Sequence, residues 1–134
     1  MSYILGIFYM TSNQLGLPPH LLSSICYVES HYKVTAVHHD DGDGDSLGVC
    51  QIKLKTARWL GYKGTKKNLM NPTINAYFAG KYLKHQIKRY KGDIKKAVIS
   101  YNLGHAKGLT STEYQRKVYK KWRRLCSGIH MKNI

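Results

Sequence analysis

Helix start and stop signals recur along this sequence of 134 residues and limit the folds that it can adopt. Gly16 and Gly104 each follow an apolar pattern of helical period, which is typical of a helix end. Asn71-Pro72 is a favourable N-cap and first-turn pair, and Asp93 is a second N-cap candidate. No segment sustains the two-residue alternation of a half-buried strand. The sequence therefore predicts a mostly α-helical fold.

The expected helices follow from their apolar faces and their caps. We expect Pro19 in the first turn of the second helix, and the segment Thr110-Ser111-Thr112-Glu113 as a capping box for the last one. Residues 62–70 read as a basic connection, and the region 38–52 holds at most a small β-hairpin. Neither a repeat nor a low-complexity linker divides the chain, so residues 1–134 are expected to form a single domain. The helices are predicted over residues 2–14, 17–30, 53–60, 72–90, 94–103 and from 113 onward.

Charge is divided very unevenly along the chain, whose net charge is +15. Residues 1–52 hold one basic residue and five acids, whereas residues 53–134 hold 21 basic residues and two acids. A polyanion such as nucleic acid, an anionic envelope polymer or an anionic lipid surface is the natural partner of such a basic half. The last helix, "YQRKVYKKWRRLC", could lie on an envelope polymer or a membrane, and it could equally be a solvated basic face.

The three cysteines are Cys26, Cys50 and Cys126. Their odd number and unpaired spacing argue against a disulfide framework, and no CxxC or His/Cys cluster suggests zinc. The first ten residues, "MSYILGIFYM", lack the basic region and the cleavage site of an export signal. We therefore expect synthesis in a reducing cytoplasm, with no metal ion and no cofactor.

Glu29 stands where an apolar residue would be expected. It shares one face of its predicted helix with Leu22 and Ile25, and it lies at the C-terminal end. Burial and the negative end of the helix dipole both raise the pKa of a carboxyl group. A glutamic acid with a raised pKa is what glycoside cleavage requires of its general acid. A glutamate that turns to solvent or pairs with a lysine would show the same pattern.

Four segments in a fixed order resemble the lytic transglycosylase family, the relatives of goose-type lysozyme. They are Glu29-Ser30, "LGVCQI", "NPTINAYFAGKYL" and "AVISYNLG". They are similar to a Glu-Ser helix end, a Gly-x-x-Gln turn, an Asn-bearing helix that ends in Gly-x-Tyr-Leu, and a Tyr-Asn-x-Gly block. The resemblance covers about residues 15–120. It implies a lysozyme-like fold and cleavage of the β-1,4 bond between N-acetylmuramic acid and N-acetylglucosamine in peptidoglycan.

The resemblance also assigns roles to residues. Glu29 matches the catalytic acid and base, whereas Asn75, Tyr82 and Leu83 match a mainly structural helix. His38 stands where the family often has a serine, nine residues after the glutamate. The expected substrate contacts are Ser30, His38, Gly48, Gln51, Tyr101 and Asn102, although Tyr101 could equally be a core aromatic.

The loop before Gly48 carries Asp40, Asp41, Asp43 and Asp45. If Glu29 is the only acting carboxyl group, the resemblance implies a 1,6-anhydro product, formed with help from the acetamido group of the sugar. If Asp41, Asp43 or Asp45 acts as a second carboxylate, as in goose-type lysozymes, the product is a reducing sugar. The loop also begins like a calcium loop, but its sixth and twelfth positions lack the glycine and glutamate, so we expect no metal ion.

A basic nucleic-acid-binding or envelope-binding protein is the competing class. Such binding needs no glutamate on an apolar face, so we favour the peptidoglycan enzyme and expect no specific nucleic acid. We expect a monomer that acts on the periplasmic or cell-wall substrate. Without an export signal it would arrive by another route, and its small size fits a phage lysin.

Overall fold

The computed structural model describes residues 2–40 and 42–132 and confirms the mostly helical prediction. Three short strands, β1 (Val37–His38), β2 (Ser46–Leu47) and β3 (Ile52–Lys53), lie between the second and third helices. None of the helices in the described ranges has both the length and the apolar composition to cross a membrane. The helices are α1 (Ser2–Leu15), α2 (Leu21–Ser30), α3 (Leu54–Trp59), α4 (Lys66–Leu69), α5 (Pro72–Arg89), α6 (Ile94–Leu103) and α7 (Glu113–Lys132).

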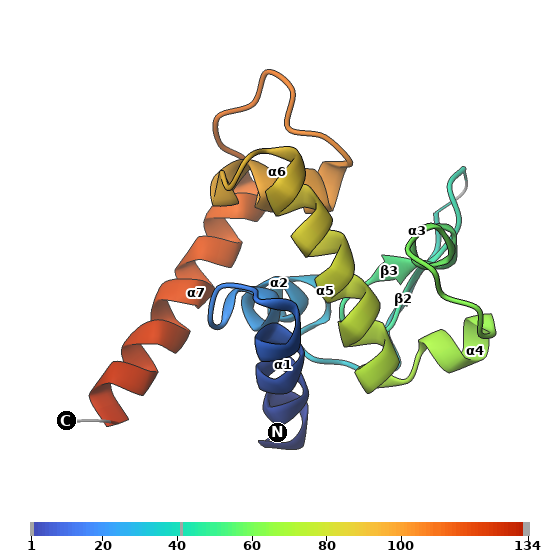
Figure 1. Ribbon diagram of the computed structural model, residues 1–134, viewed down its shortest axis with the longest axis horizontal. Helices are drawn as coiled ribbons and strands as arrows, with labels where there is room; N and C mark the ends of the chain where they lie inside the picture. The colour runs from blue at the N-terminus through green and yellow to red at the C-terminus, as the bar shows by residue number, and fades with distance from the viewer. Residues whose placement is uncertain (1, 41, 133–134) are drawn as a thin grey trace.

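The long helix α5 organises the arrangement in Figure 1. Helices α1 and α6 pack against α5, and α2 packs against α7. The strands, α3 and α4 lie on the opposite side of α5 from α7 (Figure 1). Glu29 lies near the end of α2, between the helical part and the small sheet.

Two apolar clusters hold these parts together. The larger one surrounds α2, whose Leu21, Leu22 and Ile25 are completely buried. The smaller one lies under the sheet and includes Leu47 and Leu69. Because α5 contributes to both clusters, it fixes the position of the sheet relative to α2.

The sheet is slightly larger than the hairpin that was expected. Strand β2 pairs antiparallel with β1, with Val37 opposite Leu47, and also with β3, with Leu47 opposite Ile52. Strand β3 can reach β2 because the chain reverses within residues 48–51.

Two of the predicted helix starts are confirmed by their hydrogen bonds. The Asn71 side chain accepts from the backbone N–H groups of Thr73 and Ile74, and Asp93 accepts from that of Lys96. Both caps satisfy N–H groups that the first turn of a helix leaves without partners.

Three other helix boundaries differ from the prediction. Helix α2 begins at Leu21, after Pro19, and its N-cap residue His20 has a positive φ of 67°. The N-cap contact of α7 comes from Thr112, whose hydroxyl accepts from Gln115 N–H, rather than from Thr110. The expected connection 62–70 contains α4, capped by Thr65. Side-chain caps mark the starts of α4 and α7, whereas His20 makes no side-chain cap hydrogen bond at the start of α2.

The expectation about the cysteines is wrong, because Cys26 and Cys50 form a disulfide. Both are completely buried, and the bond joins α2 to the turn after β2. Cys126 is free and exposed on α7, which explains the odd number. Sequence spacing could not reveal the pair, because the fold alone brings these two positions together.

We expect the disulfide to stabilise the fold substantially. Its two ends are 24 residues apart, and closing such a loop contributes about 3 kcal/mol to the free energy of unfolding. In a Cys126→Ser background, which prevents exchange, reduction should lower the melting temperature by roughly 10 °C. Thermal melts with and without reductant measure this. An unchanged melting temperature, with free thiols confirmed by titration, would contradict the prediction.

Candidate active site

The turn at residues 48–51 forms one wall of the site, and its geometry requires a glycine at position 48. Gly48 has a φ of +76°, and a Cβ atom there would lie 2.8 Å from the Asn75 side-chain carbon Cγ. Asn75 is completely buried on α5. Its oxygen accepts from Cys50 N–H at 2.9 Å, and its nitrogen donates to the carbonyls of Leu47 and Leu69 at 2.8 and 2.9 Å. Gly48 is therefore required by both its backbone angle and the close approach of Asn75.

Two further side chains hold the same turn from the helical side. The Ser30 hydroxyl donates to the Val49 carbonyl at 2.7 Å, and the Tyr101 hydroxyl donates to the Cys50 carbonyl at 2.8 Å. Ser30, an expected substrate contact, is thus directed into the protein and does not line the cleft. Tyr101 lines the cleft with its ring but uses its hydroxyl proton on the backbone.

Next to this turn, a cleft of about 680 Å³ opens between α2, the sheet and the end of α6. It brings together six of the predicted residues, whereas Gly48 and Ser30 lie behind its wall. Tyr82, expected to be structural, also lines the cleft, with its ring 5.2 Å from that of Tyr101. The predicted residues that line it are Glu29, His38, Asp43, Gln51, Tyr101 and Asn102.

Among the carboxyl groups of this cleft, Glu29 has the pKa that departs most from its ordinary value. Burial raises its pKa from 4.5 to about 7, and a hydrogen bond from Tyr114 opposes part of that rise. The Tyr114 hydroxyl donates to Glu29 Oε2 at 2.7 Å. Burial, with the nearby Glu29 charge, holds the pKa of Tyr114 well above its usual value, so Tyr114 remains a donor. Near neutral pH, Glu29 can therefore both give and take a proton.

Tyr114 is the residue that the sequence did not identify. It stands on the apolar face of α7 and is separated from Glu29 by 85 positions. Its sequence context is that of a core aromatic, and the packing of α7 on α2 alone brings it to the carboxyl group.

Gln51 and the exposed rim residues contribute polar groups to the cleft. The Gln51 amide donates to the carbonyls of Ala36 and Gly48 at 3.1 and 3.0 Å, so a substrate contact would use its carbonyl oxygen. His38 on β1 and Asn102 at the end of α6 are both exposed. Both line the cleft, His38 from the sheet and Asn102 from α6.

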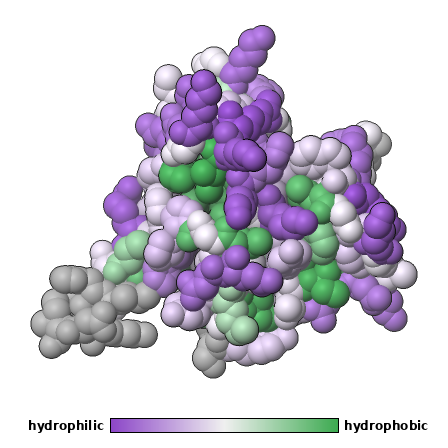
Figure 2. Space-filling view, viewed as in Figure 1, coloured by the Kyte–Doolittle hydropathy of each residue, from purple (hydrophilic) through white to green (hydrophobic). Residues whose placement is uncertain are grey.

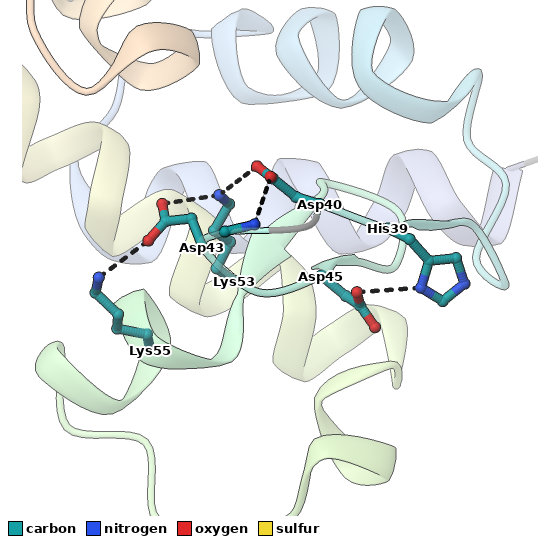
Figure 3. Close-up of polar contacts among 7 residues, drawn as sticks. His39, Asp40, Asp43, Asp45, Lys53 and Lys55 are labelled. Carbon is teal, nitrogen blue, oxygen red and sulfur yellow. Dashed lines mark hydrogen bonds and ion pairs between the residues drawn. The ribbon is translucent and has the colours of Figure 1, made fainter.

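Lysines hold Asp40 and Asp43, as Figure 3 shows. Lys53 contacts Asp40 at 3.3 Å and Asp43 at 2.9 Å, and Lys55 contacts Asp43 at 3.1 Å. Asp45 pairs with Lys66 and with His39, each at 3.1 Å.

These contacts determine the charge state of the three aspartates. The pKa is lowered for Asp40 chiefly by Gly42 N–H, for Asp43 by Lys53, and for Asp45 by Lys66. Asp40 and Asp43 line the cleft, Asp45 does not, and Asp41 lies outside the described residues. Among the described residues, no cluster of three or more His, Cys, Asp or Glu side chains is arranged to hold a metal ion.

Comparisons with known proteins show the family to which this fold belongs. The family model described as the transglycosylase SLT domain matches residues 6–123. The peptidoglycan transglycosylase gp16 of Escherichia phage T7 is 28% identical over 105 residues, which is 76% of this chain and 8% of that protein.

A solved structure shares the fold. It is the lytic transglycosylase Slt of Pseudomonas aeruginosa, in an inactive Glu-to-Gln mutant form. It matches with a TM-score of 0.66 and 17% identity, over 89% of this chain and 21% of that one. This chain thus spans only a small part of both relatives. Because the family model matches most of its length, the chain belongs to the SLT transglycosylase domain family.

Proposed function

We propose that this chain is a peptidoglycan lytic transglycosylase that cleaves the β-1,4 bond between N-acetylmuramic acid and N-acetylglucosamine. The observation that carries this proposal is Glu29, a cleft carboxyl group with a pKa of about 7. The relative from phage T7 is named for the same activity. We infer that residues 1–134 act as one catalytic unit, with Glu29 as both acid and base and without a cofactor.

The first step uses the protonated form of Glu29. Glu29 gives its proton to the glycosidic oxygen while the bond from that oxygen to C1 of N-acetylmuramic acid breaks. The acetamido oxygen of the same sugar forms the new bond to C1, as in substrate-assisted glycosidases. Tyr114 holds the carboxyl group in place and stabilises the carboxylate that this step leaves.

The second step uses the ionised form of Glu29. The carboxylate takes the proton of the C6 hydroxyl, and O6 attacks C1 while the acetamido oxygen leaves. The product carries a 1,6-anhydro ring, and Glu29 is protonated again. One carboxyl group therefore completes the cycle, provided that water is kept from C1.

The loop aspartates bear on the alternative, a goose-type lysozyme-like hydrolase. Asp40 and Asp43 line the cleft, which is what a second carboxylate would need. Both are bound to Lys53, and a carboxylate held by an ammonium group is a weak base. This pairing favours the transglycosylase, in which no second carboxylate acts.

We also infer that the enzyme works as a monomer at the cell wall. The basic residues from Lys53 onward would hold it on anionic envelope polymers or on a membrane surface. A protein whose main function is nucleic-acid binding would have no use for the Glu29–Tyr114 pair in a cleft.

Replacing Glu29 tests the acid directly. We expect Glu29→Gln to lower peptidoglycan clearing by at least about 100-fold, because the amide cannot donate the required proton. Because the pKa of Glu29 is raised in the folded state, the free energy of unfolding falls as the pH rises from 4.5 through about 7, where the buried carboxyl group ionises. The Gln variant should therefore melt at or above the wild-type temperature at alkaline pH. Retention of more than roughly a tenth of the wild-type rate would exclude Glu29 as the essential acid.

Replacing Tyr114 tests how the pKa of Glu29 is set. The Tyr114→Phe change removes the donor that lowers this pKa, so the pKa should move above about 7. The alkaline limb of the pH–rate profile should shift to higher pH. Tyr119→Phe makes the same chemical change elsewhere on α7 and is the matched control. A limb that stays in place, or moves to lower pH, would show that Tyr114 does not tune Glu29.

Mass spectrometry of digested peptidoglycan distinguishes the two enzyme types. We expect muropeptides with a 1,6-anhydro end, each one water lighter than the hydrolytic product. Asp40→Asn and Asp43→Asn should reduce the rate only modestly and keep the anhydro product. Reducing-end products, together with severe loss in one aspartate variant, would instead establish the hydrolase.

A further inference from the structure

The outward face of α1 differs from that of an ordinary surface helix. Its sequence, SYILGIFYMTSNQL, contains no charged residue. Large apolar side chains project from it to solvent: Tyr3, Tyr9 and Met10 are 68, 66 and 71% exposed, and Leu5 is 38% exposed. Surface helices usually place charged residues on this side. A cluster of exposed apolar side chains on a neutral helix is characteristic of a binding surface.

A groove of about 640 Å³ runs between this helix and the C-terminal part of α7. Leu5, Phe8 and Tyr9 line it from α1, and Leu125 lines it from α7. Pro19 and Ser23, around the start of α2, also line it. In Figure 2, green and pale surface lies at the lower end of the molecule, where Figure 1 places α1. The groove is large enough for part of an acyl chain.

The edge of the groove is cationic. Arg124 lines it directly, and Lys120 and Arg123 are exposed on the same part of α7. The acid of α7, Glu113, stands at the other end of the helix and is paired with Lys117. An apolar groove bordered by cations is complementary to a lipid with an anionic headgroup.

We propose that the groove between α1 and α7 binds an anionic phospholipid and seats the chain on an anionic membrane. The acyl chain occupies the apolar groove, and the arginines contact the headgroup. Tyr3 and Tyr9 suit the membrane interface because each ring is apolar with a polar tip. A second copy of the chain is disfavoured as the occupant, because both copies carry a net charge of +15.

This surface leaves the catalytic cleft free. The groove reaches α2 at Ser23, whereas the cleft reaches it at Glu29, and the two share no lining residue. A chain bound through α1 would therefore keep its cleft open to glycan beside the membrane. The proposal does not depend on the proposed reaction, because lipid binding is measured without peptidoglycan.

Vesicle co-sedimentation tests the surface. The wild type should bind vesicles of equal parts phosphatidylglycerol and phosphatidylcholine, and bind pure phosphatidylcholine far more weakly. Tyr9→Ser combined with Met10→Ser should lower the affinity by roughly tenfold or more, because two exposed apolar anchors are lost. Arg123→Gln combined with Arg124→Gln should weaken binding to the anionic vesicles similarly.

Matched controls separate this face from general charge or hydrophobicity. Trp59→Ser removes an exposed aromatic residue from α3, and Lys95→Gln with Lys96→Gln removes two exposed charges from α6. Both controls should bind within about twofold of the wild type, since they lie on neither α1 nor α7. If they weaken binding as much as the α1 and α7 variants do, the proposal is wrong.

Fluorescence tests whether an acyl chain enters the groove. The Trp122 indole donates to the carbonyl of Pro19, which lines the groove, so the indole lies next to a groove residue. In a Trp59→Phe variant, brominated acyl chains in the anionic vesicles should quench Trp122. In a Trp122→Phe variant, Trp59 should remain unquenched. Unquenched Trp122, or a dimer in sedimentation equilibrium that Tyr9→Ser with Met10→Ser dissociates, would overturn the proposal.

Discussion

The turn at residues 48–51 is the constraint on which the site depends. A chain reversal inside the protein exposes backbone polar groups that must find partners away from water. Asn75, Ser30 and Tyr101 supply them from α5, α2 and α6, and the disulfide at Cys50 adds a covalent link to α2. Within the described residues, no buried side-chain polar atom is left without a partner. The same contacts that satisfy the turn therefore fix three helices around one cleft.

The chemistry of Glu29 results from a balance between burial and one hydrogen bond. Burial favours the neutral acid, whereas the Tyr114 hydroxyl favours the carboxylate. With burial the larger effect, the pKa remains near 7. A residue that must exchange a proton in both directions needs this intermediate state. Helix α7 is thus part of the site through the hydrogen bond from Tyr114 to Glu29. None of its described residues lines the cleft itself.

The uneven charge of the chain serves two purposes. Asp40, Asp43 and Asp45 are held by lysines from the basic half, so part of the opposite charge is paired within the molecule. These pairs keep the loop beside the cleft and occupy the carboxylates that could otherwise compete with Glu29. The cations of α7 remain exposed next to α1, which carries no charged residue. Together the two helices form a second surface, separate from the cleft.

The sequence by itself determined the helical class, most helix boundaries and the place of Glu29 on the inward face of its helix. Caps such as Asn71 and Asp93 act within one turn, and the face that carries Glu29 follows from helical period alone, so local sequence contains this information. Only the tertiary structure decided the Cys26–Cys50 bond, the contact of Tyr114 with Glu29, and the inward direction of Ser30. Each of these depends on how segments that are far apart in the sequence pack together, and no local sequence pattern specifies that packing. The resemblance could mark Ser30 and Tyr101 as belonging to the site, but only the fold shows that both hydroxyls hold the turn.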